Sequence, residues 1–239
     1  MNIHVISLKR TPARLEAFIK SNPNINFEVF EAIDSKKINL EIISKDILPD
    51  SCNYRIGAIG NALSHITLWA RAAEGNELIT ICEDDAFFHK DFSLSSQKLI
   101  NDIGNDFDFF AWGWNFDSTL WASPLPFLTP CRMEFSQESI RLNMGHFLSS
   151  PVNPIPLRLH NSCGTIAYTI TPSGAKKLLS CLLPLKNEIK VLVPNMAVIT
   201  ITPTALDMAM GEAFMKTNSF VSFPPLVLTK NEFSESTVM

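Results

Sequence analysis

The sequence lacks the long apolar run that a membrane-spanning helix needs. No stretch approaches the roughly 18 apolar residues that cross a bilayer, and the run from 191 to 201 is interrupted by Pro194 and Asn195. We also expect no secretory signal, because the basic pair Lys9-Arg10 follows the first apolar run, whereas positive charge precedes that run in a signal. These features predict a cytoplasmic protein and are compatible with a peripheral contact with the inner face of a membrane.

Charge and clustered cysteine are also scarce. Charged residues make up 18% of the 239 residues and the formal net charge is −4, which argues against nucleic acid as the main partner. A local basic pocket for phosphate is still compatible with this balance. The five cysteines are widely spaced and form no Cys-x-x-Cys pair, so they predict no zinc site. They favour a reducing compartment in which the thiols pack as small hydrophobic groups.

What the sequence does contain is an alternation of strand and helix signals. The apolar run 3–8 predicts a buried strand, and Thr11-Pro12 suits the start of a helix. A strand at 27–30 completes a strand–helix–strand unit, which usually pairs its strands in parallel. The pattern continues with a helix at 57–73, a strand at 78–82, a helix at 94–103, a strand at 107–112, a strand at 164–170 and a helix at 172–183.

Two regions lack this periodicity. Residues 113–160 contain six prolines and are predicted to form long loops, which in a folded domain are usually functional or mobile. The last twenty residues, with Pro224-Pro225, are predicted to form an irregular tail over the surface. Three tryptophans could stack on sugar rings, although core packing is the usual role of an aromatic side chain: Trp112, Trp114 and Trp121.

Three carboxylates, Glu83, Asp84 and Asp85, follow the clearest predicted strand. Ligands bind outside the carboxyl ends of strands in parallel α/β sheets, and adjacent carboxylates repel one another where water screens them poorly. Mg²⁺ or Mn²⁺ held by one or two carboxylates and by substrate phosphates would relieve this repulsion and neutralise a diphosphate leaving group. The alternative is an acidic turn that caps a helix beginning near Phe87. The motif alone does not separate a transferase from a magnesium-dependent phosphohydrolase.

Several segments carry a resemblance in the same order along the chain. Residues 5–14 form an opening strand and basic turn, 57–65 read Gly-x-x-Gly-x-x-x-Ser-His, 81–86 hold the acidic motif, and 164–179 form a late strand and helix. With Asp207, the Pro-Pro-Leu-Val run at 224–227 and Ser236-Thr237, these segments resemble glycosyltransferase family 25. That family comprises lipooligosaccharide-type galactosyltransferases related to collagen galactosyltransferases.

The resemblance implies a fold and an activity. The fold would be a GT-A-type, Rossmann-like single α/β domain with a mainly parallel central sheet flanked by helices. About 1–110 would form the nucleotide-sugar half, and about 111–239 the acceptor half and C-terminal tail. The activity would be inverting transfer of a sugar, commonly galactose from UDP-galactose, onto a saccharide or glycolipid acceptor such as lipooligosaccharide, with Mn²⁺ or Mg²⁺ at a DxD-like motif.

The resemblance also suggests roles for individual residues. Arg suits phosphate because its planar fork donates two hydrogen bonds at once, although a solvated basic face is the alternative for the first helix. A loop-to-helix junction would explain Gly60 equally well, and His65 suits a structural or supporting role. The expected metal ligands are Asp85 and Asp84, and the expected nucleotide-sugar contacts are Ser7, Leu8, Lys9, Arg10, Arg14, Gly60, Ser64, Glu83 and Asp84.

Inverting transfer also needs a general base for the acceptor hydroxyl. Asp207 and Glu212 are the late acidic candidates, and the resemblance favours Asp207, although an acidic residue that opens a helix is common. Some relatives of this fold complete the metal site with a late histidine, but no histidine follows His160. The third protein ligand is therefore absent or replaced, or water takes its place.

Two other classes of function compete with a transferase. The missing late histidine keeps open a non-catalytic module that binds a saccharide or a nucleotide on the same scaffold. A magnesium-dependent phosphohydrolase ranks last, because the sequence has no recognisable nucleophile or glycine-rich phosphate loop.

Overall fold

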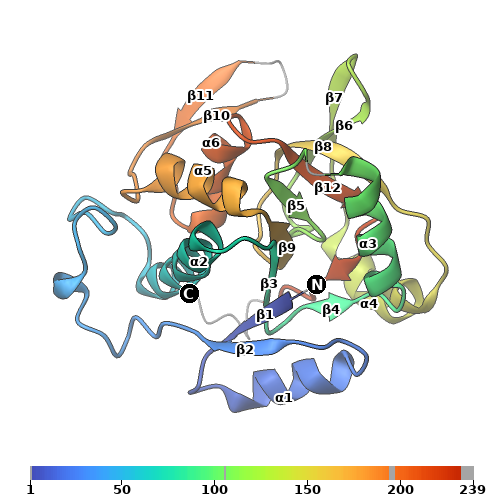
Figure 1. Cartoon of the computed structure of the whole chain (residues 1–239), viewed down its shortest axis with the longest axis horizontal. Helices are drawn as coiled ribbons and strands as arrows, with labels where there is room; N and C mark the ends of the chain where they lie inside the picture. The colour runs from blue at the N-terminus through green and yellow to red at the C-terminus, as the bar shows by residue number, and fades with distance from the viewer. Residues whose placement is uncertain (1, 105, 194–196, 233–239) are drawn as a thin grey trace.

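In the computed structural model, which describes residues 2–104, 106–193 and 197–232, nine strands form one central sheet (Figure 1). The strand order is β2-β1-β3-β9-β5-β12-β8-β6-β7. The strands are β1 (Asn2–Ser7), β2 (Glu28–Glu31), β3 (Ile79–Glu83), β5 (Phe109–Ala111), β6 (Leu120–Leu125), β7 (Thr129–Met133), β8 (Ile155–Asn161), β9 (Ala167–Ile170) and β12 (Ser219–Phe223). Two further ladders pair β4 (Phe87–Phe88) with β13 (Val227–Leu228), and β10 (Ile189–Leu192) with β11 (Val198–Ile201).

The pairing makes this a mixed sheet. β1 lies between β2 and β3 and is parallel to both, as the predicted strand–helix–strand unit requires. β9 then inserts antiparallel between β3 and β5, and β5 pairs in parallel with β12. The predicted α/β class, a central sheet flanked by helices, is confirmed. The helices are α1 (Pro12–Ser21), α2 (Ile56–Glu74), α3 (Phe92–Ile103), α4 (Gln137–Ser149), α5 (Pro172–Leu182) and α6 (Leu206–Phe214), with a short 3₁₀ turn η1 (Leu40–Ile42).

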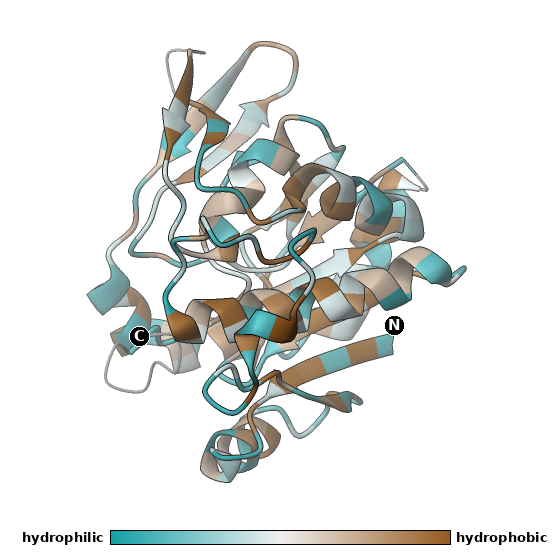
Figure 2. Cartoon of the chain, turned by 90° about the vertical axis from the view of Figure 1, so that its left-hand side faces the viewer, coloured by the Kyte–Doolittle hydropathy of each residue, from teal (hydrophilic) through white to brown (hydrophobic). Residues whose placement is uncertain are grey.

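Helices cover both faces of the sheet, and the strand residues alternate between two hydrophobic clusters. Successive side chains of a strand point to opposite faces. Ile81 accordingly packs in the cluster that holds α2, α5 and α6, whereas Cys82 packs in the cluster that holds Phe18 of α1 and Phe92 of α3. Figure 1 shows α2, α5 and α6 gathered on the left of the sheet and α3 on the right. In Figure 2, β1, beside the N-terminal label, is largely hydrophobic.

Local signals place the ends of several elements. α1 begins at Pro12, whose missing N–H costs nothing in the first turn, and α2 ends against Gly75, as predicted. In α5 the Thr171 side chain accepts a hydrogen bond from the Gly174 N–H at 3.0 Å. All five cysteines are free thiols, and no helix in the described ranges is long and apolar enough to cross a membrane.

The prediction that residues 113–160 form long loops was wrong. This stretch holds β6, β7, α4 and β8, and β7 lies at the edge of the sheet. Proline lacks the N–H that an inner strand donates, so it is tolerated at an edge or a bulge. Pro124 lies where the β6–β7 register shifts, and Pro130 lies in β7 itself. The tryptophans of this region and Trp112 are buried, as the core-packing alternative requires.

The predicted surface tail was also wrong over its described part. β12 lies inside the central sheet, and Leu226 and Val227 are fully buried. The N–H groups of both residues donate to the Trp112 carbonyl at 2.9 and 3.0 Å, which fixes the chain after Pro224-Pro225. Val227 and Leu228 form β13, which pairs with β4 at Phe87–Phe88. Because Phe87 lies in a strand, the alternative in which the acidic motif caps a helix near Phe87 is excluded. Residues 233–239, with Ser236-Thr237, lie outside the described residues.

Candidate active site

The predicted acidic motif lies on the wall of a cavity of about 430 Å³. The cavity lies at the carboxyl end of β3, where ligands bind in α/β sheets. Three separate parts of the chain close it: α1 supplies Arg14, the segment after β8 supplies Gly164 and Thr165, and the start of α6 supplies Asp207. Residues 229–232 form a further wall. The fold therefore joins the early acidic and basic segments to the late acidic one.

Asp84 is held by two residues of the opening segment. Ser7 donates its hydroxyl hydrogen to Asp84 Oδ2 at 2.7 Å, and Arg14 donates from Nε to Oδ1 at 2.7 Å. The Arg14 Nη2 atom also lies 2.7 Å from Oδ1. Asp84 is buried, and these contacts compensate the cost of burying its charge. In this arrangement Asp84 anchors α1 to the end of β3.

Glu83 is stabilised from the opposite side, by residues of α2 and of the segment before β9. Its Oε1 atom accepts hydrogen bonds from Thr165 Oγ1 and from Asn61 Nδ2, the latter at 3.4 Å, and lies 3.7 Å from His65 Nε2. Burial by itself would raise the pKa of Glu83, but His65, Thr165 and Asn61 outweigh that effect and lower the pKa. Glu83 is therefore ionised at neutral pH.

Asp85 differs from its two neighbours because little compensates its charge. Its side chain is 36% exposed, and Arg14 Nη2 is 3.5 Å from Oδ2. Burial of the carboxyl in the cavity wall and the charges of Glu83 and Asp84 raise the pKa of Asp85 to about 7, against the opposing effect of Arg14. Asp85 therefore presents a hard oxygen ligand to the cavity in a site with excess negative charge.

This donor set fits a divalent cation that takes most of its ligands from a substrate. Within the described ranges, no group of three or more His, Cys, Asp and Glu side chains could hold a metal ion on its own. Mg²⁺ and Mn²⁺ sites that use one or two carboxylates and substrate phosphates need no such group. Asp85 fits as the direct ligand, whereas the Asp84 oxygens already accept hydrogen bonds from Ser7 and Arg14.

The two candidates for a general base lie in different surroundings. Asp207 lines the cavity from the first turn of α6, and its Oδ2 accepts the Gly164 N–H at 2.8 Å. Burial raises the pKa of Asp207, although the N–H groups of Gly164 and Met208 oppose the shift. Glu212 is outside the cavity lining and pairs with Lys216 at 3.0 Å and Lys186 at 3.3 Å. Because these lysines outweigh burial and lower its pKa, Glu212 is the weaker base.

The remaining predicted contacts surround a smaller cavity of about 50 Å³. Leu8, Arg10 and Arg14 line it together with Gly60 and Ser64, and it shares its Glu83 and Asp84 wall with the larger cavity. The Arg10 Nε atom donates to Asp34 Oδ2 at 3.0 Å. Lys9 is exposed and lines neither cavity, which agrees with the solvated alternative for that position.

Gly60 and Ser64 also have a structural use within the chain. A Cβ atom on Gly60 would lie 2.5 Å from the carbonyl oxygen of Ile33, so the glycine lets the chain after β2 cross α2 closely. The Ser64 hydroxyl donates to the Gly60 carbonyl at 2.8 Å and accepts the Ile33 N–H at 2.8 Å. Both side-chain interactions are thus satisfied within the protein.

Sequence reasoning missed three residues of the larger cavity. Asn61 and Thr165 bond Glu83 from positions 22 and 82 residues away, and neither stands in a pattern that signals a carboxylate partner. Lys230 lines the cavity from the chain after β13 and places its amine 5.7 Å from the centre of the Phe87 ring. Lys230 was missed because residues 220–239 were predicted to form a surface tail. It brings a second cationic side chain to this cavity beside Arg14.

Comparison with known proteins gives one family. Residues 1–194 match the family described as Glycosyltransferase family 25 (LPS biosynthesis protein). A protein of Rattus norvegicus named "Probable inactive glycosyltransferase 25 family member 3" is 30% identical over 113 residues, which cover 42% of this chain and 20% of that protein. "Inactive glycosyltransferase 25 family member 3" of Mus musculus is 28% identical over 113 residues, covering 42% and 19%. The chain spans about a fifth of the length of these relatives.

Proposed function

The chain belongs to glycosyltransferase family 25, and we propose that it transfers a sugar from a nucleotide-sugar donor to a saccharide acceptor. The observation that carries this proposal is the single cavity in which Asp85, Arg14 and Asp207 meet. A transfer of this kind needs a site for a diphosphate and a base for a hydroxyl. The cavity offers candidates for both on walls that come from distant parts of the sequence.

For the donor we propose a UDP-sugar, with UDP-galactose as the first to test. The diphosphate would lie between Asp85, Arg14 and Lys230, which line the same cavity. Mn²⁺ or Mg²⁺ bound by Asp85 and the diphosphate would supply Lewis-acid stabilisation of the leaving UDP. The Arg14 and Lys230 side chains would donate charge-assisted hydrogen bonds to the diphosphate oxygens. The planar guanidinium of Arg14 can donate two of them side by side.

For the acceptor we propose a saccharide hydroxyl, on lipooligosaccharide or a similar glycolipid. Asp207 would accept the hydroxyl proton while the acceptor oxygen forms a bond to the anomeric carbon and the bond from that carbon to the diphosphate breaks. Attack from the face opposite the leaving group inverts the anomeric configuration. The raised pKa of Asp207 supports this role, because a base works best when its pKa lies closer to the working pH.

The proposal is tested by donor turnover in matched variants. Wild-type protein with Mn²⁺ and a glycolipid acceptor should release UDP from one UDP-sugar of a panel. Asp85→Asn should lose that release, whereas Asp102→Asn, which changes an exposed carboxylate of α3 paired with Lys98, should keep it. Full activity in Asp85→Asn would contradict the proposal. Asp207→Asn should lower kcat more than Glu212→Gln does, and the reverse order would refute the assignment of the base.

A second candidate is a non-catalytic module that binds a nucleotide or saccharide. The names of the two relatives describe them as inactive or probably inactive, and the described residues hold no three-ligand metal group. This candidate predicts that a UDP-sugar raises the melting temperature of the protein, since ligands stabilise the state that binds them. It also predicts that no UDP is released with Mn²⁺ and acceptor present. Release of UDP that depends on the acceptor would exclude it.

A further inference from the structure

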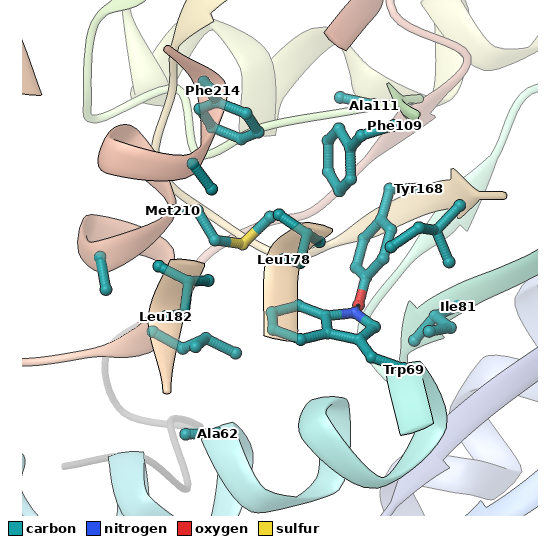
Figure 3. Close-up of a cluster of buried hydrophobic side chains, with 14 of the residues drawn as sticks. Ala62, Trp69, Ile81, Phe109, Ala111, Tyr168, Leu178, Leu182, Met210 and Phe214 are labelled. Carbon is teal, nitrogen blue, oxygen red and sulfur yellow. Dashed lines mark hydrogen bonds between the residues drawn. The ribbon is translucent and has the colours of Figure 1, made fainter. Parts of the chain in front are cut away.

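A buried chain of polar atoms leads from the core to Glu83. Trp69 and His65 lie one turn apart on α2, and Tyr168 lies opposite them on β9. The Trp69 Nε1–H donates to the Tyr168 hydroxyl at 2.7 Å, and the same hydroxyl is 2.7 Å from His65 Nδ1. Figure 3 shows the Trp69 nitrogen against the Tyr168 oxygen. All three side chains are essentially inaccessible to solvent, so water does not compete for these hydrogen bonds.

The donors and acceptors among Trp69, Tyr168 and His65 decide where the His65 hydrogen lies. An indole Nε1–H only donates, so the Tyr168 oxygen accepts from Trp69. Burial raises the pKa of Tyr168 well above its ordinary value, and the phenol keeps its own hydrogen. That hydrogen has an acceptor in range only if His65 Nδ1 is bare. An imidazole with a bare Nδ1 carries its hydrogen on Nε2. The arrangement in which the Trp69 and Tyr168 hydrogens both find acceptors therefore fixes the tautomer of His65 that carries its hydrogen on Nε2.

The fixed hydrogen points toward the site. His65 Nε2 has no hydrogen-bond partner within the usual distance limit among the described residues, and the nearest carboxylate oxygen is Glu83 Oε1 at 3.7 Å. Thr165 and Asn61 donate to that same oxygen. Glu83 lines both cavities, and no described residue donates to its Oε2. The protein donors thus gather on one oxygen of Glu83 and leave the other for a ligand.

We propose that His65 is a positioning residue: Trp69 and Tyr168 fix its Nε2–H tautomer, whose N–H faces Glu83 Oε1 at 3.7 Å and orients this carboxylate so that Oε2 accepts a hydrogen bond from a ligand hydroxyl. Under the proposed function, on which this ligand half rests, the hydroxyl belongs to the ribose or to the sugar of the donor. The assignment of the His65 tautomer depends only on hydrogen bonds within the protein. His65 acts through Glu83 and does not touch the ligand itself.

The tautomer is read from imidazole nitrogen NMR spectra of protein labelled with ¹⁵N-histidine. The chain has five histidines, and His65→Gln identifies the His65 signals by their loss. The wild type should show a bare Nδ1 and a protonated Nε2 at His65. Tyr168→Phe removes the hydroxyl that fixes Nδ1 and should abolish this single-tautomer pattern. A wild-type His65 with its hydrogen on Nδ1, or on both nitrogens at neutral pH, would overturn the inference.

The positioning role is tested by donor binding with Mn²⁺ present. His65→Leu removes the N–H that faces Glu83 Oε1 at 3.7 Å, and its Kd for UDP-galactose should rise by up to about tenfold, because a polar contact to a charged group is lost. His65→Gln can place an amide N–H near the Nε2 position and should restore binding to within about threefold. Thr67→Ala, which removes a hydroxyl that bonds only within α2, is the matched control for folding. Equal binding by the leucine and glutamine variants would refute the role.

Two ligands separate the possible sources of the hydroxyl. A loss of affinity for both UDP and UDP-galactose in His65→Leu identifies a ribose hydroxyl, and a loss for UDP-galactose alone identifies a sugar hydroxyl. If the wild type binds neither ligand, the proposed function and the ligand half of the inference both fail. The imidazole spectrum then still decides the tautomer.

Discussion

The affinity of the site for Mn²⁺ in the presence of UDP-galactose should rise with pH through neutrality. The perturbation is the pH itself, and it acts on Asp85, whose pKa is raised to about 7 by burial and by the charges of Glu83 and Asp84. A metal binds the ionised carboxylate and competes with its proton. Affinity is therefore lost as the pH falls through the pKa and is fully present above it.

The change in Mn²⁺ affinity is calculated from the loss of one proton by Asp85. With a pKa near 7, Asp85 is about one-tenth ionised at about pH 6 and about nine-tenths ionised at about pH 8, so the apparent affinity rises about tenfold. An ordinary aspartate, with a pKa of about 3.9, would give no change in this window. Because 36% of the side chain is exposed, solvent moderates the shift and tenfold is an upper limit.

Isothermal titration calorimetry measures both the affinity and the proton released. Two buffers of different ionisation enthalpy give the proton count, which should be close to one at about pH 6 and fall toward zero at about pH 8. UDP-galactose is the better ligand than UDP, because a terminal phosphate itself titrates near about pH 6. Asp85→Asn should lose the tight binding, and Asp102→Asn should keep the wild-type profile. A wild-type affinity that is flat or falls with pH would refute the reasoning.

Further perturbations test the site and its support. Gly164→Ala should lower the free energy of unfolding by about 1–3 kcal/mol in urea titrations, since φ is +96° and the new Cβ would lie 2.6 Å from Asn115 Oδ1; unchanged stability would contradict this. Asp108→Asn should cost about 1–3 kcal/mol by the same assay, because the buried carboxylate accepts from a half-exposed Lys177 at 2.7 Å. Arg14→Lys should raise the KM for donor about tenfold at similar kcat, because the planar fork is lost. Chelation with EDTA should abolish UDP release and added Mn²⁺ should restore it; activity that persists in EDTA would exclude metal dependence.

The early half of the fold was predictable because its signals are local. A proline in the first turn of α1, a glycine after α2 and short apolar runs depend on neighbours a few residues away. Boundaries moved by only one or two residues: the strand predicted at 78–82 is Ile79–Glu83. The carboxyl end of that strand, and with it the place of the acidic motif, followed from the same local pattern.

The later half was not predictable in the same way because its structure depends on distant partners. β6 pairs with β7 and β8, and Pro124 falls at an irregularity that only the paired strand reveals. Pro224-Pro225 signals a loop, yet the next residues are buried because the Trp112 carbonyl accepts their N–H groups. Proline content reports local conformation and does not report such pairing. The same limit hid Lys230, which reaches the cavity through this buried segment.

The structure also separates three carboxylates that the sequence treats as equivalent. β3 ends at Glu83, which faces His65 of α2, and Asp84 lies in the turn that follows and meets Arg14 of α1. Two of the three charges are thereby compensated within the protein before any ligand arrives. The third, Asp85, keeps an elevated pKa because burial disfavours its charge and the other two carboxylates repel it. Adjacent acids in one motif thus become a ligand support, an anchor for α1 and the proposed metal ligand, and the division arises where β3 ends at Glu83 and the chain turns at Asp84 and Asp85.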